Sequence, residues 1–306
     1  MLMTAAKSWI DEAQAILREG PVRVLRDVPL SGRTCFGIGG PARFLLAPDD
    51  PEPLAGVLGR LTGAGVPFDF LGAGSNLLVS DEGPSFVVVA AEALAAGPEI
   101  RGASVRVGAG FSVPKLVKRL QQAGLSGLEF AEGIPGSVGG CVRMNAGWHE
   151  GMFGQTVASV TTITRQGAIE EVVAGTETFA YRKSPGLGDR FVAAATLRLT
   201  PDDPGRIQER VLSFREHRVR TQPTGRKNAG CIFKNPPGDH AGRLIDATGL
   251  KGLAVGPAVV SDRHANFILN RGGATFKEVA SLIDAVREAV FKQTGIALET
   301  EVIRWI

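Results

Sequence analysis

Two side chains stand in settings where they could act on an anion or move a proton. Arg182 lies in the segment Tyr181-Arg182-Lys183-Ser184. Its planar guanidinium could clamp a carboxylate through two parallel hydrogen bonds, although a basic pair at a strand end is more often a solvated edge. Cys231 lies between Gly230 and Ile232, where a lone cysteine is most often inert core packing. Their chemistry therefore depends on what surrounds them.

A pair of glutamates forms a third candidate. Glu299 and Glu301 lie two positions apart in the segment 298–302, which reads as a strand. Residues at that spacing share one face of a strand. Two exposed surface glutamates are the commoner arrangement, and the residues alone do not choose between the two readings.

Glycine-rich turns offer a different chemistry, through the backbone. The stretch 127–147 contains the run Ile134 to Gly140, which has no side chain large enough to fill a cleft. Glycine reaches positive φ without strain, and successive N–H groups in such turns form a concave site for anions. A glycine-rich corner between two strands is the alternative.

Two further turns of this kind strengthen the anion reading. Residues 71–81 read LGAGSNLLVSD, directly after the apolar run 68–71, and residues 36–40 read FGIGG before the apolar run 42–47. The turn at 72–74 is not the dinucleotide fingerprint, because strand residues rather than a helix follow it. Three turns, each followed by strand or irregular structure, predict a pyrophosphate held by loops rather than by one helix N-terminus.

The elements that must position these residues follow from apolar periodicity and turn residues. A capping box at Thr275 and Glu278 begins the clearest helix, and Pro201 to Gly205 is the best linker candidate. Predicted helices cover 5–19, 51–65, a segment from Ser112 to Gly124, 207–217 and 275–292. Predicted strands cover 22–28, 42–47, 68–71, 86–90, 105–107, 157–164, 168–173, 191–199 and 296–306, those from 157 to 199 in a mainly antiparallel sheet.

Composition limits the class of protein. A chain of 306 residues suits two or three domains, and 44% apolar with 21% charged residues is typical of a soluble globular protein. A net charge of +3 argues against dedicated nucleic-acid binding. Three cysteines without a C-x-x-C spacing indicate free thiols in a reducing compartment, with no disulfide framework and no zinc site. Without a recognisable signal peptide or membrane span, we expect a cytoplasmic protein.

Seven motifs in register resemble one family. RTCFGIGGPARF, LGAGSNLLVSD, GIPGSVGGCVRMNAG, YRKS, NAGCIFKNP, HANFILN and LETEV occur in that order between about Thr34 and Val302. Together they resemble the UDP-N-acetylenolpyruvoylglucosamine reductases (the MurB family), flavoenzymes of peptidoglycan precursor synthesis. The resemblance implies an α+β fold, with a two-subdomain FAD-binding lobe of the vanillyl-alcohol-oxidase/PCMH type and a smaller α+β substrate-binding lobe. We expect domains at 1–80 (with a returning strand 300–306), 81–204 and 205–299.

The resemblance also implies the reaction. NADPH reduces non-covalently bound FAD, NADP⁺ leaves, and the enolpyruvyl ether of UDP-N-acetylglucosamine is then reduced to UDP-N-acetylmuramate. This is a step of cell-wall biogenesis, and hence of cell shape and division. No nucleic acid, membrane or obligate protein partner is expected.

Roles transfer residue by residue from the matching motifs. Arg182 stabilises the developing enolate, Cys231 stands where the family has serine or sometimes cysteine as proton donor, and Glu301, directly before the valine, is the acid partner. Substrate contacts are expected at Tyr181, Arg182 and Asn235. The FAD contacts expected in the glycine-rich motifs are Gly39, Gly72, Gly74, Ser75, Asn76, Leu77, Pro135, Gly136, Ser137, Gly139 and Asn145; no metal ligand is expected.

The chain departs from a major subgroup of the family, and rival functions remain. That subgroup covers its substrate with a tyrosine on an inserted loop, but the only tyrosine here is Tyr181, so we expect the other subgroup. Basic residues between 210 and 227 could meet the diphosphate or NADPH, or form a solvated helix face. The alternatives are another flavin oxidase or dehydrogenase, and a non-catalytic nucleotide-binding module.

FAD should be released by acid. Related oxidases attach the ring through a histidine or cysteine near the glycine turn. Here the first histidine is His149, and no cysteine lies between Cys35 and Cys141. Acid precipitation of the yellow protein should leave all the colour in the supernatant, and colour in the pellet would contradict the prediction.

Overall fold

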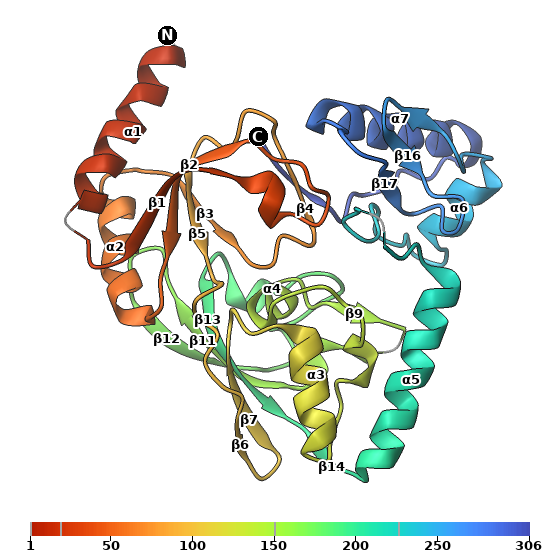
Figure 1. The fold of residues 1–306 in the computed structure, drawn as a ribbon, viewed down its shortest axis with the longest axis horizontal. Helices are drawn as coiled ribbons and strands as arrows, with labels where there is room; N and C mark the ends of the chain where they lie inside the picture. The colour runs from red at the N-terminus through yellow and green to blue at the C-terminus, as the bar shows by residue number, and fades with distance from the viewer. Residues whose placement is uncertain (1, 19, 150, 226) are drawn as a thin grey trace. The chain divides into compact units, whose positions relative to one another are not determined.

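The computed structural model describes residues 2–18, 20–149, 151–225 and 227–306 (Figure 1). It divides into two compact units. Unit 1 comprises Met1–Asp27, Arg43–Ala73 and Ser85–Glu216, and unit 2 comprises Val28–Ala42, Gly74–Pro84 and His217–Ile306. No helix in the described ranges is long and apolar enough to cross a membrane.

The first sheet of unit 1 contains, in spatial order, β1 (Arg23–Pro29), β2 (Pro41–Ala47), β5 (Val87–Ala90) and β3 (Phe68–Leu71). β2 and β3 both pair with β5 in parallel, and every residue of β5 is buried, as its β-branched run predicts. The helices next to it in sequence are α1 (Leu2–Arg18) and α2 (Pro51–Gly63). Asp50 caps α2 by accepting a hydrogen bond from Glu52 N, and Pro51 occupies the first turn.

The second sheet of unit 1 is antiparallel throughout, in the order β12 (Ile169–Val173), β11 (Val157–Ile163), β13 (Phe191–Arg198), β7 (Ser104–Gly108) and β6 (Glu99–Arg101). The short helix α4 (Val138–Arg143) packs against β13. The remaining elements are α3 (Val113–Gln122), the paired strands β8 (Leu125–Ser126) and β14 (Thr200–Pro201), the hairpin of β9 (Gly147–Trp148) and β10 (Gly151–Met152), and the 3₁₀ turns Glu129–Ala131, Phe153–Gln155 and Pro185–Leu187. One continuous apolar core from Ala13 to Val211 holds unit 1 together.

Unit 2 has its own core, which runs from Phe36 to Val302. Its sheet is β15 (Ala254–Val255), β16 (Ala258–Val260) and β17 (Ile268–Asn270), and its helices are α6 (Ala241–Ala247) and α7 (Phe276–Thr294). The last strand, β18 (Ile303–Trp305), pairs in parallel with β4 (Leu77–Val79), and the 3₁₀ turn Leu30–Arg33 belongs to the same unit. The helix α5 (Pro204–Thr221) carries the chain from unit 1 into unit 2.

Most predicted elements are confirmed, and α7 is the clearest case. Thr275 and Glu278 form the capping box, and Gly295 ends the helix in the left-handed conformation at φ 72°. The predicted stripe is the buried one: Val279, Leu282, Ile283, Val286 and Val290. The predicted domain boundaries differ from the two units and stay a prediction.

Three sequence expectations are wrong. The linker at 201–205 is structured, because Pro201 ends β14 and Pro204 begins α5. The final strand covers Ile303–Trp305 instead of 296–306. The central glycine-rich stretch contains a helix, α4, capped by Ser137; the strand or irregular structure expected after its glycine turn does not form.

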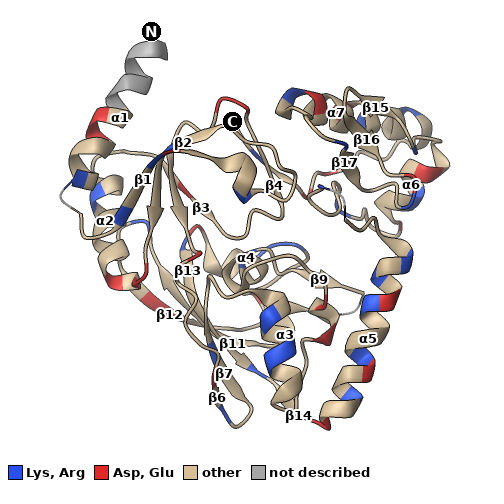
Figure 2. Ribbon diagram, viewed as in Figure 1, with Lys and Arg blue, Asp and Glu red and all other residues tan. Residues whose placement is uncertain are grey.

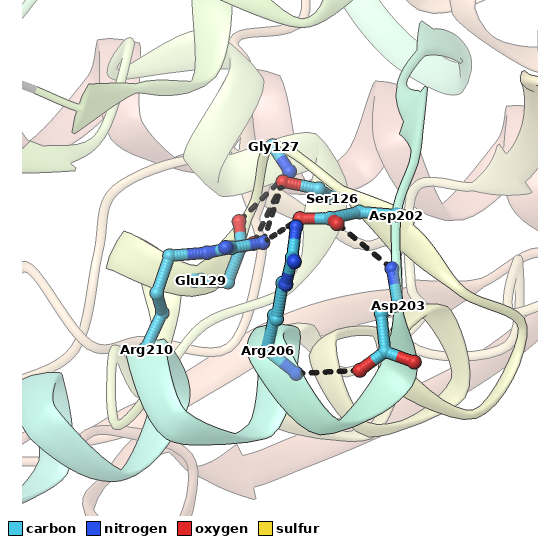
Figure 3. A network of polar contacts seen from close by, with 7 residues as sticks. All are labelled: Ser126, Gly127, Glu129, Asp202, Asp203, Arg206 and Arg210. Atoms are coloured by element: carbon cyan, nitrogen blue, oxygen red, sulfur yellow. Dashed lines mark hydrogen bonds and ion pairs between the residues drawn. The ribbon is translucent and has the colours of Figure 1, made fainter.

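The start of α5 explains why the linker expectation failed (Figure 3). Asp203 accepts a hydrogen bond from Arg206 N at 3.0 Å and so caps the helix. Arg210 Nη2 lies 2.6 Å from Asp202 Oδ2 and 2.9 Å from Glu129 Oε1. Glu129 also accepts from Ser126 Oγ and from Gly127 N, both at 2.8 Å. The acidic residues that read as a flexible linker therefore fasten the helix to the start of the central glycine-rich stretch.

Glu129 should make stability depend on acid pH. Burial raises the pKa of Glu129, but hydrogen bonds from Gly127 N, Ser126 and Arg210 outweigh it and lower the pKa below its ordinary value. A lowered pKa means that the ionised form stabilises the fold above the unfolded pKa of about 4.3 and that this contribution is lost as pH falls below it. Glu129→Gln should lower the free energy of unfolding by about 1–2 kcal/mol at pH 7. The loss is limited because Arg210 is partly exposed and solvent screens its charge.

Urea unfolding at pH 7 and pH 3.5 tests this. The gap in unfolding free energy between wild type and Glu129→Gln should narrow at the lower pH, while Glu209→Gln, at an exposed site on α5, should differ from wild type at neither pH. An equal gap at both pH values would show that the carboxylate charge contributes nothing.

Candidate functional site

The central stretch 127–147 is held by backbone hydrogen bonds to the connection between β7 and α3. Val138 N donates to Phe111 O at 2.9 Å, Gly139 N to Ala109 O at 2.8 Å, and Val113 N to Gly136 O at 3.0 Å. A Cβ on Gly139 would lie 2.7 Å from Ala109 Cβ, closer than two carbons can approach. Glycine is therefore required here by packing, a reason that the anion reading of the sequence did not include.

Two of the three glycine turns meet in unit 1. A Cβ on Gly72 would lie 2.9 Å from Ser137 Oγ and 3.6 Å from Gly140 Cα. The chain passes from unit 1 to unit 2 directly after this turn, between Ala73 and Gly74. The structure thus places predicted cofactor residues from two distant motifs side by side.

The third turn meets the second in unit 2. Cys35 N donates to Gly74 O at 3.0 Å, and a Cβ on Gly74 would lie 1.9 Å from Arg33 O, at a φ of 63° that already favours glycine. Gly39, at φ 142°, packs against Leu30 and Val79. The segments 33–40 and 74–83, the second of which includes β4, are therefore closely packed against each other within unit 2.

Arg182 occupies a strained turn. Ala180 N donates to Lys183 O at 2.9 Å and Lys183 N returns a bond to Ala180 O at 3.2 Å. Within this turn Arg182 has φ 56°, in the left-handed region that non-glycine residues seldom adopt. Its guanidinium carbon lies 5.2 Å from the centroid of the Tyr181 ring, a cation–π distance. Strain of this kind persists only where the surroundings enforce it, and it is typical of functional sites.

Two buried side chains fix the Arg182 turn to the central stretch. Asn145 Nδ2 donates to Ala180 O at 2.8 Å, and Ser184 Oγ donates to Val142 O at 2.6 Å. Asn145 is 2% exposed and Ser184 6% exposed. The two motifs that the sequence analysis treated separately are therefore one structural unit.

In unit 2, Cys231 lies on an extended segment held by Asn266. Cys231 forms an antiparallel bridge with Phe267, and Ile232 N donates to Asn266 O at 2.8 Å. The side chain of Asn266 accepts from Phe233 N at 2.9 Å and donates to Phe233 O at 2.8 Å. Asn266 was not among the predicted site residues, and its one signal in the sequence is an amide residue between an alanine and an apolar strand.

The structure separates the two glutamates. Glu299 is exposed and pairs with Lys234, whereas Glu301 is half-buried. Glu301 N donates to Ile232 O at 2.8 Å, and Asn76 Nδ2 donates to Glu301 O at 2.9 Å. The backbone of Glu301 is thus held beside the Cys231 segment, and the side-chain amide of Asn76 bonds to its carbonyl.

The remaining predicted substrate residue, the other two thiols and His264 can be described by their contacts and burial. Asn235 Oδ1 accepts from Ala241 N at 3.1 Å, at the start of α6. Burial raises the pKa of the Cys141 thiol to about 12 and also raises that of Cys35, so neither is poised for proton transfer at neutral pH. His264 Nδ1 accepts from Asn266 N at 3.3 Å, and burial lowers the pKa of its imidazole.

The basic region after residue 205 is partly accounted for within unit 1. Arg210 pairs with Glu129 and Asp202, and Arg215 with Glu132. Figure 2 shows basic and acidic residues interspersed along α5. Arg226 lies outside the described residues. These pairs favour the solvated helix face over a phosphate site for Arg210 and Arg215.

Comparison with known proteins decides the family. A sequence model of an FAD binding domain matches residues 42–172, and a model of the C-terminal domain of UDP-N-acetylenolpyruvoylglucosamine reductase matches residues 222–305. UDP-N-acetylenolpyruvoylglucosamine reductase 2 of Symbiobacterium thermophilum is 43% identical over 96% of each chain, and the reductase of Geobacter metallireducens is 42% identical over 95% of this chain and 97% of its own. The chain belongs to the UDP-N-acetylenolpyruvoylglucosamine reductase family.

The fold also matches that of a reductase of this family, in a crystal structure of the protein from Thermus caldophilus. It matches with a TM-score of 0.80 at 40% identity, covering 93% of this chain and 100% of its own. The predicted α+β fold, with an FAD-binding domain and the family's C-terminal domain, is confirmed. The predicted membership of this FAD-dependent reductase family is confirmed as well.

The residues present fit FAD. The matched FAD binding domain contains both glycine turns that meet in unit 1, and close approach of backbone N–H groups to a pyrophosphate needs turns of this kind. Ser137, at the junction, also caps α4 through Gly140 N at 3.4 Å. The reductase family is thus matched in sequence and in fold.

Proposed function

We propose that the protein is a UDP-N-acetylmuramate dehydrogenase, which uses NADPH and FAD to reduce the enolpyruvyl ether of UDP-N-acetylglucosamine to UDP-N-acetylmuramate. The observation that carries the proposal is 43% identity to a named reductase over 96% of both chains. The match of residues 222–305 to that family's C-terminal domain favours it over other flavin oxidases. NADPH and UDP-sugars are cytoplasmic metabolites, so the enzyme would work in the cytoplasm.

The bound FAD supplies hydride transfer between NADPH and the substrate. The protein's task is then to bind the enolpyruvyl carboxylate, to stabilise the negative charge that develops when hydride reaches the double bond, and to protonate the product. Stabilisation of developing charge and positioned proton transfer are the two effects that this requires.

Arg182 would stabilise the enolate. Its guanidinium can bind a carboxylate through two hydrogen bonds and is always charged. Its left-handed backbone, at φ 56° and fixed from both sides of the turn, supports a role that needs a set orientation. Tyr181, 45% exposed and stacked near this guanidinium, would contact the substrate beside it.

Cys231 would donate the final proton, with Glu301 as its acid partner. Cys231 is partly exposed, whereas Cys141 is buried, and the backbone bond from Glu301 N to Ile232 O holds the two residues on adjoining segments. Asn235 would contact the substrate from the end of the same segment. We still expect this chain to belong to the subgroup without the tyrosine loop, so that another part of the protein covers the substrate.

The direct test is NADPH oxidation by the purified, FAD-loaded protein. Consumption should require the enolpyruvyl substrate, and mass spectrometry should find a product two mass units heavier, as expected for addition of hydride and proton. Oxidation of NADPH at the same rate without the substrate, or a colourless protein that cannot be reconstituted with FAD, would refute the proposal.

Arg182→Lys should separate the two half-reactions. A point charge cannot replace bidentate contact with a carboxylate, so transfer to the enolpyruvyl substrate should fall while flavin reduction by NADPH stays near wild type. Stopped-flow spectroscopy follows each step by itself, and Lys183→Arg, a change at the exposed neighbour, is the matched control. Equal slowing of both steps, or of neither, would remove Arg182 from enolate stabilisation.

Cys231 should give kcat an alkaline limb. A thiol must be protonated to act as an acid, and an unperturbed thiol has a pKa of about 8.5, so kcat should fall with an apparent pKa at or below about 8.5. Cys231→Ser should remain active without that limb. Cys231→Ala should lose roughly 10²–10⁴-fold in kcat, with normal flavin reduction by NADPH.

The alternative of a packed core cysteine gives different results. Cys231→Ala would then reduce stability more than rate, and the pH profile would not change with serine. A full pH–rate profile of wild type and both variants distinguishes the two, and an alkaline limb that survives intact in Cys231→Ser would exclude Cys231 as the proton donor.

A further inference from the structure

Asn145 has both ends of its side-chain amide committed to the protein. Its Nδ2 donates to Ala180 O at 2.8 Å, and its Oδ1 accepts from Gly154 N at 2.8 Å. The side chain is 2% exposed. From the sequence we expected Asn145 to contact FAD, but an amide with its donor and acceptor both used inside the protein has little left to offer a cofactor.

The choice of asparagine is explained by the backbone as well as the side chain. Asn145 has φ 41°, and asparagine tolerates this left-handed region better than most residues. Its N–H donates to Val142 O at 3.1 Å, directly after Met144, which caps the end of α4. The residue therefore joins the end of α4, the turn at Gly154 and the turn at Ala180.

The contact with Ala180 bears directly on Arg182. Ala180 and Lys183 are bonded to each other in both directions, and Arg182 is enclosed between them. Fixing Ala180 O therefore fixes the start of the two-residue loop that holds Arg182 in its left-handed conformation. Ser184, bonded to Val142 O at 2.6 Å, fixes the other end.

We propose that Asn145 is a positioning residue for Arg182, which orients the guanidinium through the backbone of Ala180 and does not bind FAD. The proposal rests on the role of Arg182 in the proposed function. Without the bond from Asn145 to Ala180 O, the backbone of Arg182 would relax toward negative φ values. This bond and the bond from Ser184 to Val142 O balance the strain at Arg182. A shift of the guanidinium by about 1 Å is enough to lower a rate by about 100-fold.

The test uses Asn145→Asp and Asn145→Gly in the FAD-loaded protein. Aspartate keeps the acceptor for Gly154 N but cannot donate to Ala180 O when ionised. Glycine removes both contacts and adopts φ 41° without strain. Asn145→Gly therefore provides the test if Asn145→Asp gives little folded protein. Both should hold FAD with wild-type affinity and be reduced by NADPH within about threefold of the wild-type rate, while transfer to the enolpyruvyl substrate falls roughly 10–100-fold.

Two further variants complete the design. Ser184→Ala should show the same division between half-reactions, because it frees the other end of the turn. Thr162→Val removes the hydrogen bond from a fully buried Thr162 Oγ1 to Glu170 O in the β11–β12 pair, and it should slow neither half-reaction. Loss of FAD affinity in the Asn145 variants, with normal transfer by the molecules that retain FAD, would overturn the proposal in favour of a cofactor contact.

The outcomes also separate this inference from the function on which it rests. If Arg182→Lys slows transfer to the enolpyruvyl substrate and the Asn145 variants do not, the positioning role alone fails. If Arg182→Lys leaves that step intact, the assignment of Arg182 fails, and the positioning role fails with it.

Discussion

A buried amide must find hydrogen-bond partners, and the way Asn145 meets this constraint organises the site in unit 1. Leaving a buried polar atom without a partner costs about 1–3 kcal/mol. Asn145 satisfies both ends by joining segments that are far apart in sequence, at Gly154 and Ala180. Together with the bond from Ser184 to Val142, it ties the glycine-rich stretch to the arginine turn. The close contact of Gly72 with Ser137 adds the second glycine turn.

Unit 2 uses the same device on its own residues. Asn266 is 2% exposed and bonds to both backbone groups of Phe233, which fixes the segment that carries Cys231. Asn76 bonds to the carbonyl of Glu301 and accepts from Ile303 N at 3.0 Å. Side-chain amides thus hold the backbone beside each proposed catalytic residue, through Asn145 near Arg182, Asn266 near Cys231 and Asn76 at Glu301.

The sequence predicted well where local chemistry decides the structure. The capping box and apolar stripe of α7, and the valine run of β5, are local patterns and were confirmed. The segment 201–205 shows the limit, because Asp and Pro are equally typical of linkers and of helix starts. Only the partners Arg206 and Arg210 show that Asp203 caps α5 and that Asp202 is fastened to it.

Long-range contacts could not be predicted from one sequence. The motifs that resemble the family pointed to Arg182, Cys231 and Glu301, yet nothing local in the sequence connects Asn145 with Ala180 or Asn266 with Phe233. From the sequence, the glycines were interpreted as an anion site or as a glycine-rich corner between strands, but the close packing that requires glycine at Gly139 and Gly74 is visible only in the structure. Site residues could be named from motifs, but the residues that orient them became visible only in the fold.

The most direct test of this account is a crystal structure of the FAD-loaded Asn145→Gly protein. The account predicts that α4 and the glycine turns keep their places while the 180–183 turn moves and Arg182 leaves its φ of 56°. An Arg182 backbone that stays left-handed, with its guanidinium still beside Tyr181, would contradict the claim that the amide of Asn145 holds the arginine in position.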